Sequence, residues 1–388
     1  MVSASSSPNS KAPIRYGMVG GGKDAFIGAV HRIAARIDGH YELVAGALSS
    51  NPTKSAASAR ELGLERSYGT YQEMAKGEAA REDGIEVVTI VTPNHMHFPI
   101  AKAFLQADIH VICDKPLTST LADAKKLAAI AKKSGKLFVL THNYTGYPMV
   151  RQMREMVARG KLGDIRLVQA EYVQDWLTEK VEATGQKQAE WRTDPKRSGG
   201  GGAIGDIGTH AFNLASFISG QQLDSLAADL DSFVKGRKLD DNAHIMMRFK
   251  GGAKGMLWAS QVAPGNENSL KVRVFGTKGG IEWEQENPNH FWYTPFGQPK
   301  QLITRGGAGS SAVADRVSRT PGGHPEGYLE GFATLYSEAA IAIRALRKKN
   351  GKIPKSVIFP TVEDGVDGLR FIDACLRSSK KNAGWIKF

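Results

Sequence analysis

Short apolar segments alternate with amphipathic segments over residues 14–140, and this alternation limits the fold more than any other feature of the sequence. We expect strands at 14–19, 41–48, near Tyr68, and at 85–91, 110–113 and 137–140. The segment 85–91 is almost continuously apolar, as in a parallel strand that is covered on both faces. Between the strands, apolar residues recur at helical spacing, for example Phe26, Val30 and Ile33. Alternating strands and helices predict an α/β domain built on a doubly wound parallel sheet.

The carboxyl ends of these strands form the expected ligand site, because doubly wound sheets bind their ligands beyond that edge. Five strand ends carry small, polar or charged residues, at 20–22, 49–51, 92–94, 114–116 and 141–143. We therefore predict that these five segments line one crevice.

The rest of the chain has a different pattern. After a bridging helix at 148–158, the expected strands are 165–173, 243–249, 255–260, 271–275 and 280–283, and the expected helices are 206–218, 328–347 and 362–378. Turn signals between several of these strands predict an α+β domain with a largely antiparallel, open sheet. The expected organisation is a disordered lead-in at 1–12, a dinucleotide-binding domain at 13–145, and a domain for substrate binding and oligomerisation at 146–388. The last helix is a candidate to pack back on the first domain.

The composition is that of a globular protein, with 41% hydrophobic and 23% charged residues among 388. No apolar run reaches the roughly 18 residues that a membrane-spanning helix needs, and the first residues lack the apolar core of a secretory signal. Cys113 and Cys375 cannot build a disulfide framework and lack metal-ligand spacing. We expect a cytoplasmic protein. A broad open sheet needs a cover, which favours a homodimer or homotetramer formed through the second domain.

The net charge of +12 is compatible with nucleic-acid binding or with a basic surface that attracts small anions. Lys and Arg are scattered along the chain, and no groove-reading motif accompanies them. The sequence therefore favours anionic ligands such as dinucleotides, without a nucleic-acid or membrane partner.

A glycine-rich turn follows the first strand. Gly20 and Gly22 match the first two positions of the G-x-G-x-x-G pattern, whereas the third glycine, Gly28, comes three residues later than usual. The strand–turn–helix context still favours a phosphate-binding turn over a plain tight turn.

The end of the second strand lacks the carboxylate that selects NAD in many such domains. Ser49, Ser50 and Asn51 can hydrogen-bond either a ribose 2′-hydroxyl or a 2′-phosphate, and Lys54 can contact a phosphate. NAD and NADP both remain open at this point.

Two further motifs carry acid–base groups. Lys115 precedes Pro116 at the end of the fifth strand, where a ligand contact is favoured over a surface salt bridge, and a cis Lys115–Pro116 bond is one option. Asp206 and His210 are four residues apart, so a helix would place them on one face as an acid–base pair. The alternatives are an N-terminal capping role for Asp206 and a core position for His210. No third ligand at the usual spacing accompanies them, so we predict no metal site.

With these motifs, the chain resembles the Gfo/Idh/MocA family of NAD(P)-dependent sugar and cyclitol oxidoreductases. The resemblance covers nearly everything after the first dozen residues. It is based on the Gly20/Gly22/Gly28 turn, the segment 92–97, Asp-Lys-Pro at 114–116 in place of the family's Glu-Lys-Pro, and Asp206-x-x-x-His210. It implies a Rossmann domain followed by an α+β domain, with Lys115 and His210 as the catalytic pair and Asp206 as a substrate-orienting partner. The segment 323–328 is similar to one in members that act on inositols and sugars, including levoglucosan-type dehydrogenases, where a histidine of this region can reach the substrate.

The resulting prediction is hydride transfer between a secondary ring alcohol of a sugar, anhydrosugar or cyclitol and NAD, with NADP as a further option. His210 would be the base, Lys115 would stabilise the charge that develops on oxygen, and Asp206 would raise the basicity of His210. The predicted cofactor contacts are Gly20, Gly22, Phe26, Ile27, Ser49, Ser50, Lys54, Thr92, Pro93, Asn94, His97, Asp114, Lys115 and Asn143. The predicted substrate contacts are Lys115, Asn143, Trp191, Arg192, Asp206, His210 and His324, although Trp191 could equally be a core residue. The alternatives are an NADP-preferring sugar reductase and a dinucleotide-sensing protein without catalysis.

Overall fold

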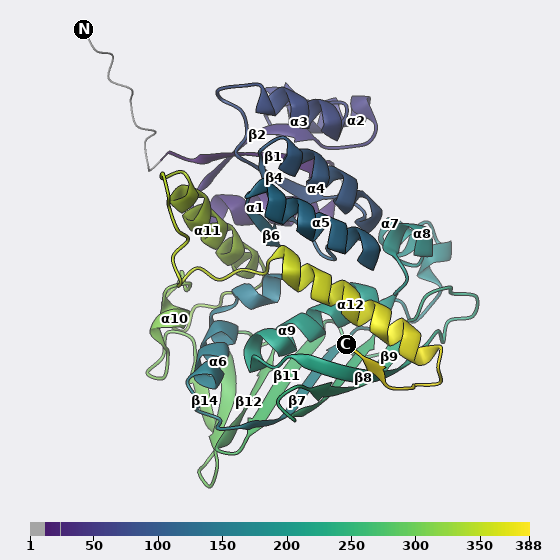
Figure 1. The fold of residues 1–388 in the computed structure, drawn as a ribbon, viewed down its shortest axis with the longest axis vertical. Coiled ribbons are helices and arrows are strands. Elements are labelled where there is room, and N and C mark those ends of the chain that lie inside the picture. The colour runs from purple at the N-terminus through teal and green to yellow at the C-terminus, as the bar shows by residue number, and fades with distance from the viewer. Residues whose placement is uncertain (1–11, 24) are drawn as a thin grey trace.

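The computed structural model describes residues 12–23 and 25–388, so nearly all of the predicted lead-in lies outside the described residues. The first half contains a six-stranded sheet in which all neighbouring strands are parallel (Figure 1). Its order is β3-β2-β1-β4-β5-β6, which is the Rossmann order. The strands are β1 (Ile14–Gly20), β2 (Tyr41–Ala47), β3 (Arg66–Ser67), β4 (Val87–Val91), β5 (His110–Cys113) and β6 (Phe138–Leu140). The predicted parallel sheet is confirmed.

Helices alternate with these strands where the sequence predicts them. They are α1 (Phe26–Ile37), α2 (Pro52–Glu61), α3 (Tyr71–Ala79), α4 (His97–Gln106) and α5 (Leu121–Ser134). Local capping fixes several starts, since the side chains of Asn51, Thr70 and Thr120 each accept a bond from a backbone N–H of the helix that follows. Gly135 ends α5 in the left-handed conformation.

The second half forms a nine-stranded mixed sheet of order β14-β13-β12-β11-β7-β10-β9-β8-β15. Its strands are β7 (Ile165–Val173), β8 (Leu223–Asp231), β9 (Asn242–Phe249), β10 (Lys254–Ser260), β11 (Ser269–Gly276), β12 (Gly279–Glu284), β13 (His290–Pro295), β14 (Gln301–Thr304) and β15 (Ile386–Lys387). The pair β7–β10 is parallel and the other pairs are antiparallel, as expected for a largely antiparallel sheet. Helix α9 (Thr209–Ser219) packs on one face of the sheet against β7 and β11, and helix α6 (Pro148–Ala158) packs against α9. The other face exposes apolar side chains, including Leu167, Met246 and Met256.

Short helical segments lie between the longer elements of both halves. They are η1 (Asn94–Met96), η2 (Asn143–Gly146), η3 (Val181–Ala183), α7 (Lys187–Arg192), α8 (Pro195–Ser198), η4 (Ile204–Gly208) and α10 (Ala312–Asp315). None of the helices within 12–23 and 25–388 combines the length and the apolar character needed to cross a membrane.

Helix α11 (Tyr328–Leu346) belongs to the second half of the sequence but packs against α1 in the first (Figure 1). The hydroxyl of its Tyr336 lies 2.8 Å from His31 Nδ1 and 3.0 Å from Thr89 Oγ1, and Tyr41 donates to its carbonyl. These side chains are buried, and the hydroxyls and His31 Nδ1 bind one another across the interface, whereas His31 Nε2 has no partner among the described residues.

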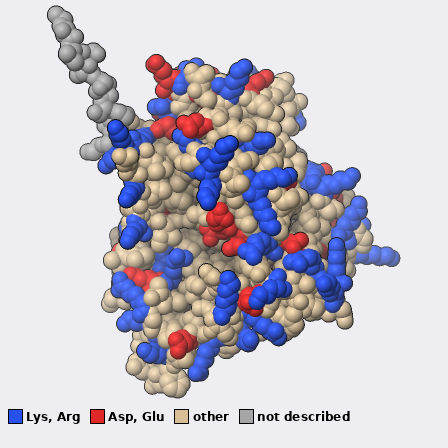
Figure 2. Space-filling view, viewed as in Figure 1, with Lys and Arg blue, Asp and Glu red and all other residues tan. Residues whose placement is uncertain are grey.

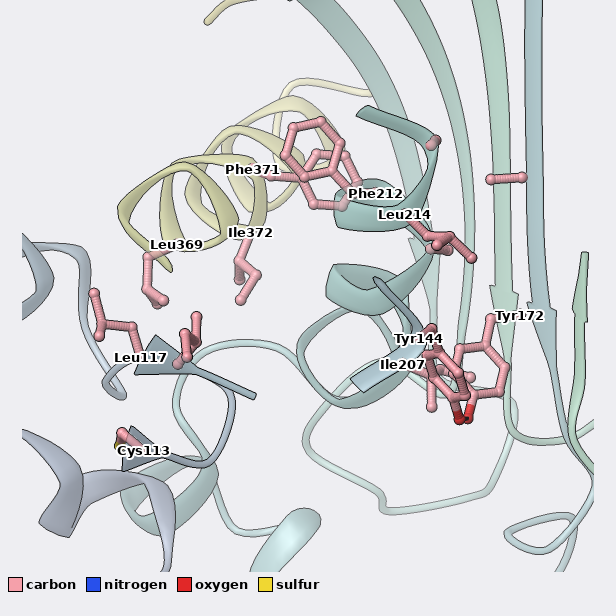
Figure 3. Packing of buried hydrophobic residues seen from close by; sticks show 14 of the residues in the cluster. Cys113, Leu117, Tyr144, Tyr172, Ile207, Phe212, Leu214, Leu369, Phe371 and Ile372 are labelled. Atoms are coloured by element: carbon pink, nitrogen blue, oxygen red, sulfur yellow. Dashed lines mark hydrogen bonds between the residues drawn. The ribbon is translucent and has the colours of Figure 1, made fainter. Parts of the chain in front are cut away.

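Helix α12 (Val362–Ser379) crosses both halves, since it contacts α5 on one side and β8 on the other. Figure 3 shows its Leu369 and Ile372 near Leu117 of the parallel-sheet half, and its Phe371 against Phe212 of α9. The two phenyl rings stack at 4.3 Å and 3°. Burial of one such side chain contributes about 1.5–3 kcal/mol to the stability of the fold. Because buried residues of both halves belong to one continuous core, this core fixes the position of the two halves relative to each other.

Candidate active site

One large cavity of about 1960 Å³ lies at the carboxyl ends of the parallel strands and reaches the second sheet. All five predicted strand-end segments contribute to its lining, through Gly20–Gly22, Ser49–Ser50, Thr92–Asn94, Asp114–Pro116 and the pair Thr141 and Asn143. Asn51 and His142 of the predicted set do not line it. Asn51 caps helix α2 instead.

The glycine-rich turn requires glycine at several positions despite its unusual spacing. Gly20 has φ +81°, and a Cβ there would lie 2.6 Å from the carbonyl oxygen of Val91. Gly28, inside α1, has its own role: a Cβ on it would lie 2.4 Å from Gly21 Cα. Gly28 therefore allows the close approach of helix and turn that the third glycine of the usual pattern provides. Phe26 and Ile27 also line the cavity.

The end of β2 places Ser49, Ser50 and Lys54 on the cavity wall. Between residues 48 and 54, all of which are described, there is no carboxylate.

Two buried polar atoms of the cavity residues have no partner among the described residues, namely Thr92 Oγ1 and Asn143 Nδ2. Buried polar groups are nearly always paired, so these two atoms suit a polar ligand. Asn94 instead donates to the carbonyl of Ser198 at 2.9 Å and ties the loop after β4 to the second half.

His97 was predicted to contact the cofactor, and the structure corrects this. The ring is buried behind the cavity wall, with Nδ1 2.7 Å from the carbonyl of Pro116 and Nε2 2.9 Å from that of Thr92. It joins the loops after β4 and β5 and so acts on the site indirectly. The sequence placed His97 near the site but could not show which way its ring faces.

Lys115 lies in the middle of the cavity, after the end of β5. The Lys115–Pro116 peptide is cis. The Nζ of Lys115 donates to Asp206 Oδ1 at 3.0 Å and to the Asp206 carbonyl at 2.6 Å. Asp114 is hydrogen-bonded by Thr141 and by the Lys115 backbone N–H, which fixes the strand end that carries the lysine.

The Asp206 carboxylate collects three donors. Besides Lys115, Arg192 Nε lies 3.2 Å and Gln261 Nε2 3.0 Å from its Oδ2. Burial opposes ionisation, but the facing cations Lys115 and Arg192 outweigh it and hold the Asp206 pKa well below its usual range. Asp206 is therefore a fixed anion that orders the amine beside it.

His210 faces the same cavity one helical turn later, as the spacing predicted. Burial first, then the positive charge of Lys115, lowers the pKa of His210 well below its ordinary value, and Asp206 opposes this with the smallest contribution. Asp206 therefore raises the basicity of His210, as expected, but burial and Lys115 outweigh its effect on the pKa. The imidazole is neutral at neutral pH and able to accept a proton.

A short π-helical turn, η4, and the helix α9 that continues it carry Asp206 and His210. Asp240 anchors the start of η4, where its carboxylate oxygens accept from Gly202 N at 2.6 Å and Ile204 N at 2.8 Å. Burial raises the pKa of Asp240 from 3.8 to about 6, partly offset by these two N–H groups.

The raised pKa gives a pH-dependent contribution to stability. The folded state holds the Asp240 proton more tightly than the unfolded state does, so this group favours folding most at low pH and loses that effect as pH rises from 3.8 to about 6. We expect the free energy of unfolding of the wild type, relative to Asp240→Asn, to fall by about 1–3 kcal/mol between about pH 4 and about pH 7. Urea unfolding of both proteins at the two pH values measures it. A difference that does not change with pH would contradict this prediction.

Several cavity residues were not predicted from the sequence. Five of them form an uncharged polar wall, and Glu267 and Glu286 line the cavity next to Asn268 and Gln285 in the chain. The wall consists of Tyr144, Tyr172, Gln174, Asn268 and Gln285. Asn268 Oδ1 accepts from Tyr172 at 2.8 Å and Gln174 at 2.7 Å, and its Nδ2 donates to Gln285 at 2.7 Å. Tyr144 and Tyr172 join through their hydroxyls at 2.7 Å, and Figure 3 shows the two rings side by side.

Trp191 and Arg192, both predicted substrate contacts, line the cavity from α7. The Arg192 guanidinium stacks over the Trp191 ring at 4.3 Å while it pairs with Asp206. Trp191 is therefore not a core residue.

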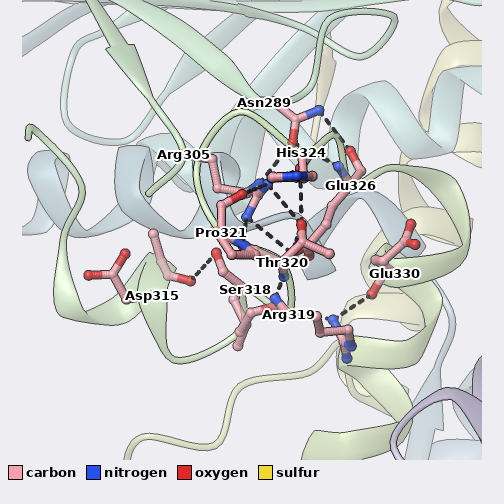
Figure 4. Close-up of polar contacts among 12 residues, drawn as sticks. Asn289, Arg305, Asp315, Ser318, Arg319, Thr320, Pro321, His324, Glu326 and Glu330 are labelled. Atoms are coloured by element: carbon pink, nitrogen blue, oxygen red, sulfur yellow. Dashed lines mark hydrogen bonds and ion pairs between the residues drawn. The ribbon is translucent and has the colours of Figure 1, made fainter. Parts of the chain in front are cut away.

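His324 does not line the cavity of this chain, which corrects its predicted substrate contact. Its side chain is exposed on the loop before α11, and its backbone carbonyl accepts from Arg305 and Thr320 (Figure 4). Arg305 and Glu326 form a buried ion pair at 3.1 Å that holds this loop. Within this chain, the segment 323–328 is part of a loop that the Arg305–Glu326 ion pair holds.

On the face in Figure 2, Lys and Arg are spread over both halves with acidic side chains between them. The net positive charge is therefore distributed on this face.

Comparison with known proteins agrees with this geometry. Residues 14–153 match the oxidoreductase family with an NAD-binding Rossmann fold, and residues 150–282 match the GFO/IDH/MocA C-terminal domain. The chain is 63% identical to an oxidoreductase from Sinorhizobium meliloti of known crystal structure, covering 97% of this chain and 100% of that one with a TM-score of 0.89.

Two further relatives have more specific names. An inositol dehydrogenase homolog from Azotobacter vinelandii, crystallised with NAD+, is 36% identical over 97% of both chains with a TM-score of 0.94, and it was also crystallised with NADH and myo-inositol. Levoglucosan dehydrogenase from Pseudarthrobacter phenanthrenivorans is 30% identical over 70% of this chain and 74% of its own length. The chain therefore belongs to the Gfo/Idh/MocA family of oxidoreductases, and its first half is the NAD-binding Rossmann domain of that family.

Proposed function

We propose that this chain is an NAD-dependent dehydrogenase that oxidises a secondary ring alcohol of an uncharged polyol, either a sugar, an anhydrosugar or a cyclitol. One observation carries the proposal: a lysine amine and a neutral imidazole line the same cavity as the nucleotide-binding turn, with Asp206 ordering the amine. This combination supplies what removal of a hydride and a proton from a carbinol requires.

The cofactor would be held by the Gly20–Gly22 turn and by the strand-end residues of β2, β4 and β5. When bound, NAD supplies the nicotinamide carbon that accepts the hydride. The positive N-terminal end of α1 lies behind the turn and favours a pyrophosphate.

The proton chemistry belongs to the chain itself. Lys115 would donate a hydrogen bond to the reacting oxygen and stabilise its negative charge as the hydride leaves. His210 would take the hydroxyl proton, because its ring is neutral and lines the cavity together with Lys115. Asp206 would hold Lys115 in place.

The polar wall supports an uncharged substrate. Its phenol and amide groups can each donate and accept, so they match the hydroxyls of a polyol, and none of them carries a charge that would pair with an acidic sugar. Two compounds named with the relatives are of this class: myo-inositol, which was crystallised with the inositol dehydrogenase homolog, and levoglucosan, after which the levoglucosan dehydrogenase is named.

The test is a screen for NADH formation, followed at its absorbance band, with inositols, hexoses and anhydrosugars. We expect turnover with at least one uncharged polyol. No turnover with any of them, together with tight NADH binding, would instead favour a dinucleotide-sensing protein.

A second candidate is an NADP-preferring reductase. The absence of a carboxylate between residues 48 and 54, within the described chain, favours it, and Lys54 lines the cavity there. Fluorescence titration with NADH and NADPH separates the two: a marked preference for NADPH would replace NAD in the proposal.

The polar wall gives a prediction on substrate affinity. Asn268→Leu removes the amide that links Tyr172, Gln174 and Gln285, so their hydrogen-bonding groups lose their fixed arrangement. Loss of one or two hydrogen bonds to the polyol should raise KM about 10-fold to 100-fold, with the NADH affinity unchanged. Asn287→Leu, an exposed amide that bonds Glu284, is the matched control and should behave as wild type. An unchanged KM in Asn268→Leu would remove the wall from the substrate site.

A further inference from the structure

His142 lies directly behind His210, on the side away from the cavity lining. The two Nδ1 atoms are 3.5 Å apart, and the rings meet edge to face with centroids 5.2 Å apart at 86°. His142 is 2% exposed, while its chain neighbours Thr141 and Asn143 line the cavity. The strand end after β6 therefore holds this second imidazole in a fixed place.

Two neutral imidazoles that meet through Nδ1 have linked tautomers. A neutral ring has one N–H and one acceptor nitrogen, so only one of the two facing atoms can carry the proton. Burial lowers the pKa of His142 to about 3, and that of His210 is also lowered, so both rings are neutral at neutral pH. When His142 Nδ1 is the acceptor, His210 carries its proton on Nδ1 and presents Nε2 as a free base.

The other groups around His210 do not make this contact. Lys115 approaches from β5 and Asp206 from η4, and they bind each other. The rings of Tyr144 and Tyr172 pack against the imidazole, but their hydroxyls bind one another. Among the described residues, His142 is thus the polar contact of His210 Nδ1.

We propose that His142 is a positioning residue that sets the ring orientation and the tautomer in which His210 accepts the substrate proton. The proposal rests on the proposed role of His210 as base. It follows the arrangement of other catalytic bases, in which a third group orients the nitrogen that faces away from the substrate. The 3.5 Å separation is long for a hydrogen bond in the free enzyme, and we expect it to shorten when cofactor and substrate bind.

Two substitutions, whose new side chains have nearly the same shape as each other, test the proposed role of His142. His142→Asn can place its Oδ1 where the imidazole has Nδ1 and so keeps an acceptor, whereas His142→Leu has a similar shape and no acceptor. We expect kcat to fall about 10-fold to 100-fold in the Leu variant and to stay within about 3-fold of wild type in the Asn variant. NADH affinity should be the same in all three proteins.

The pH profile adds a readout that a purely structural role would not change. In the Leu variant His210 loses the acceptor that stabilises its protonated ring through the Nδ1 proton, so its pKa should fall and the acid limb of kcat should move to lower pH. The other groups that face His210, namely Lys115, Asp206, Tyr144 and Tyr172, are the same in all three proteins. Equal activity of the Leu and Asn variants, whether both are active or both inactive, would overturn the proposal. If His210→Asn itself retains wild-type turnover, the proposed base is wrong, and the two failures are distinguished.

Discussion

Lys115→Met should lower kcat about 1000-fold while leaving NADH binding within a few-fold of wild type. Methionine keeps most of the side-chain length but removes the amine that would bind the reacting oxygen. Loss of one such preorganised donor typically lowers kcat by a factor of about 100 to 1000, and loss of a charged donor belongs at the upper end of this range. Asp206 keeps Arg192 and Gln261 as partners, so the site should not collapse.

The matched control is Lys126→Met, an exposed lysine on α5 whose ion pair with Asp123 lies on the surface. It should retain wild-type turnover. Steady-state kinetics with the best polyol of the screen, and fluorescence titration with NADH, measure the two effects. Turnover of Lys115→Met within 10-fold of wild type would show that the amine does not act in the reaction.

His210→Asn should lower kcat about 100-fold to 10,000-fold, the range over which a positioned general base contributes. Asparagine fills the space near the helix but cannot present a basic nitrogen at Nε2. In the wild type, burial and Lys115 lower the pKa of His210, so the base stays unprotonated as pH falls through 6.5. Wild-type kcat/KM should therefore not decline until the pH is well below 6.5.

His244→Asn controls for the loss of a histidine, because His244 is exposed on β9 and stacks on Trp258 away from the site. We expect it to behave as wild type. A wild-type kcat/KM that instead titrates with an ordinary histidine pKa, or a His210→Asn protein with normal turnover, would contradict the proposed base.

Much of the fold could be predicted, because the strongest signals are local. The buried parallel strand β4 and the helix α6 fall where the apolar patterns placed them. Strands β8, β13, β14 and β15 were missed. β8 has the sequence LDSLAADLD, whose Asp, Ser and Ala residues are poor strand formers, so pairing with β9 creates the strand.

The site was predictable where it follows from strand ends and helix spacing. Lys115, Asp206 and His210 belong to that group. The side-chain directions of His97 and His324 depend on neighbouring loops, which the sequence does not specify. Asn268 and Gln285 reach the cavity because β11 and β12 pair in one register, with Gln285 N bound to the Leu270 carbonyl. His142 had only its position at a strand end as a signal.

A crystal structure with NADH and a polyol identified in the screen tests the central claim most directly. We predict one hydroxyl oxygen of the ring within hydrogen-bonding distance of both Lys115 Nζ and His210 Nε2, with the other hydroxyls on the wall around Asn268. A polyol bound in the cavity with no oxygen near either side chain would contradict the proposed chemistry.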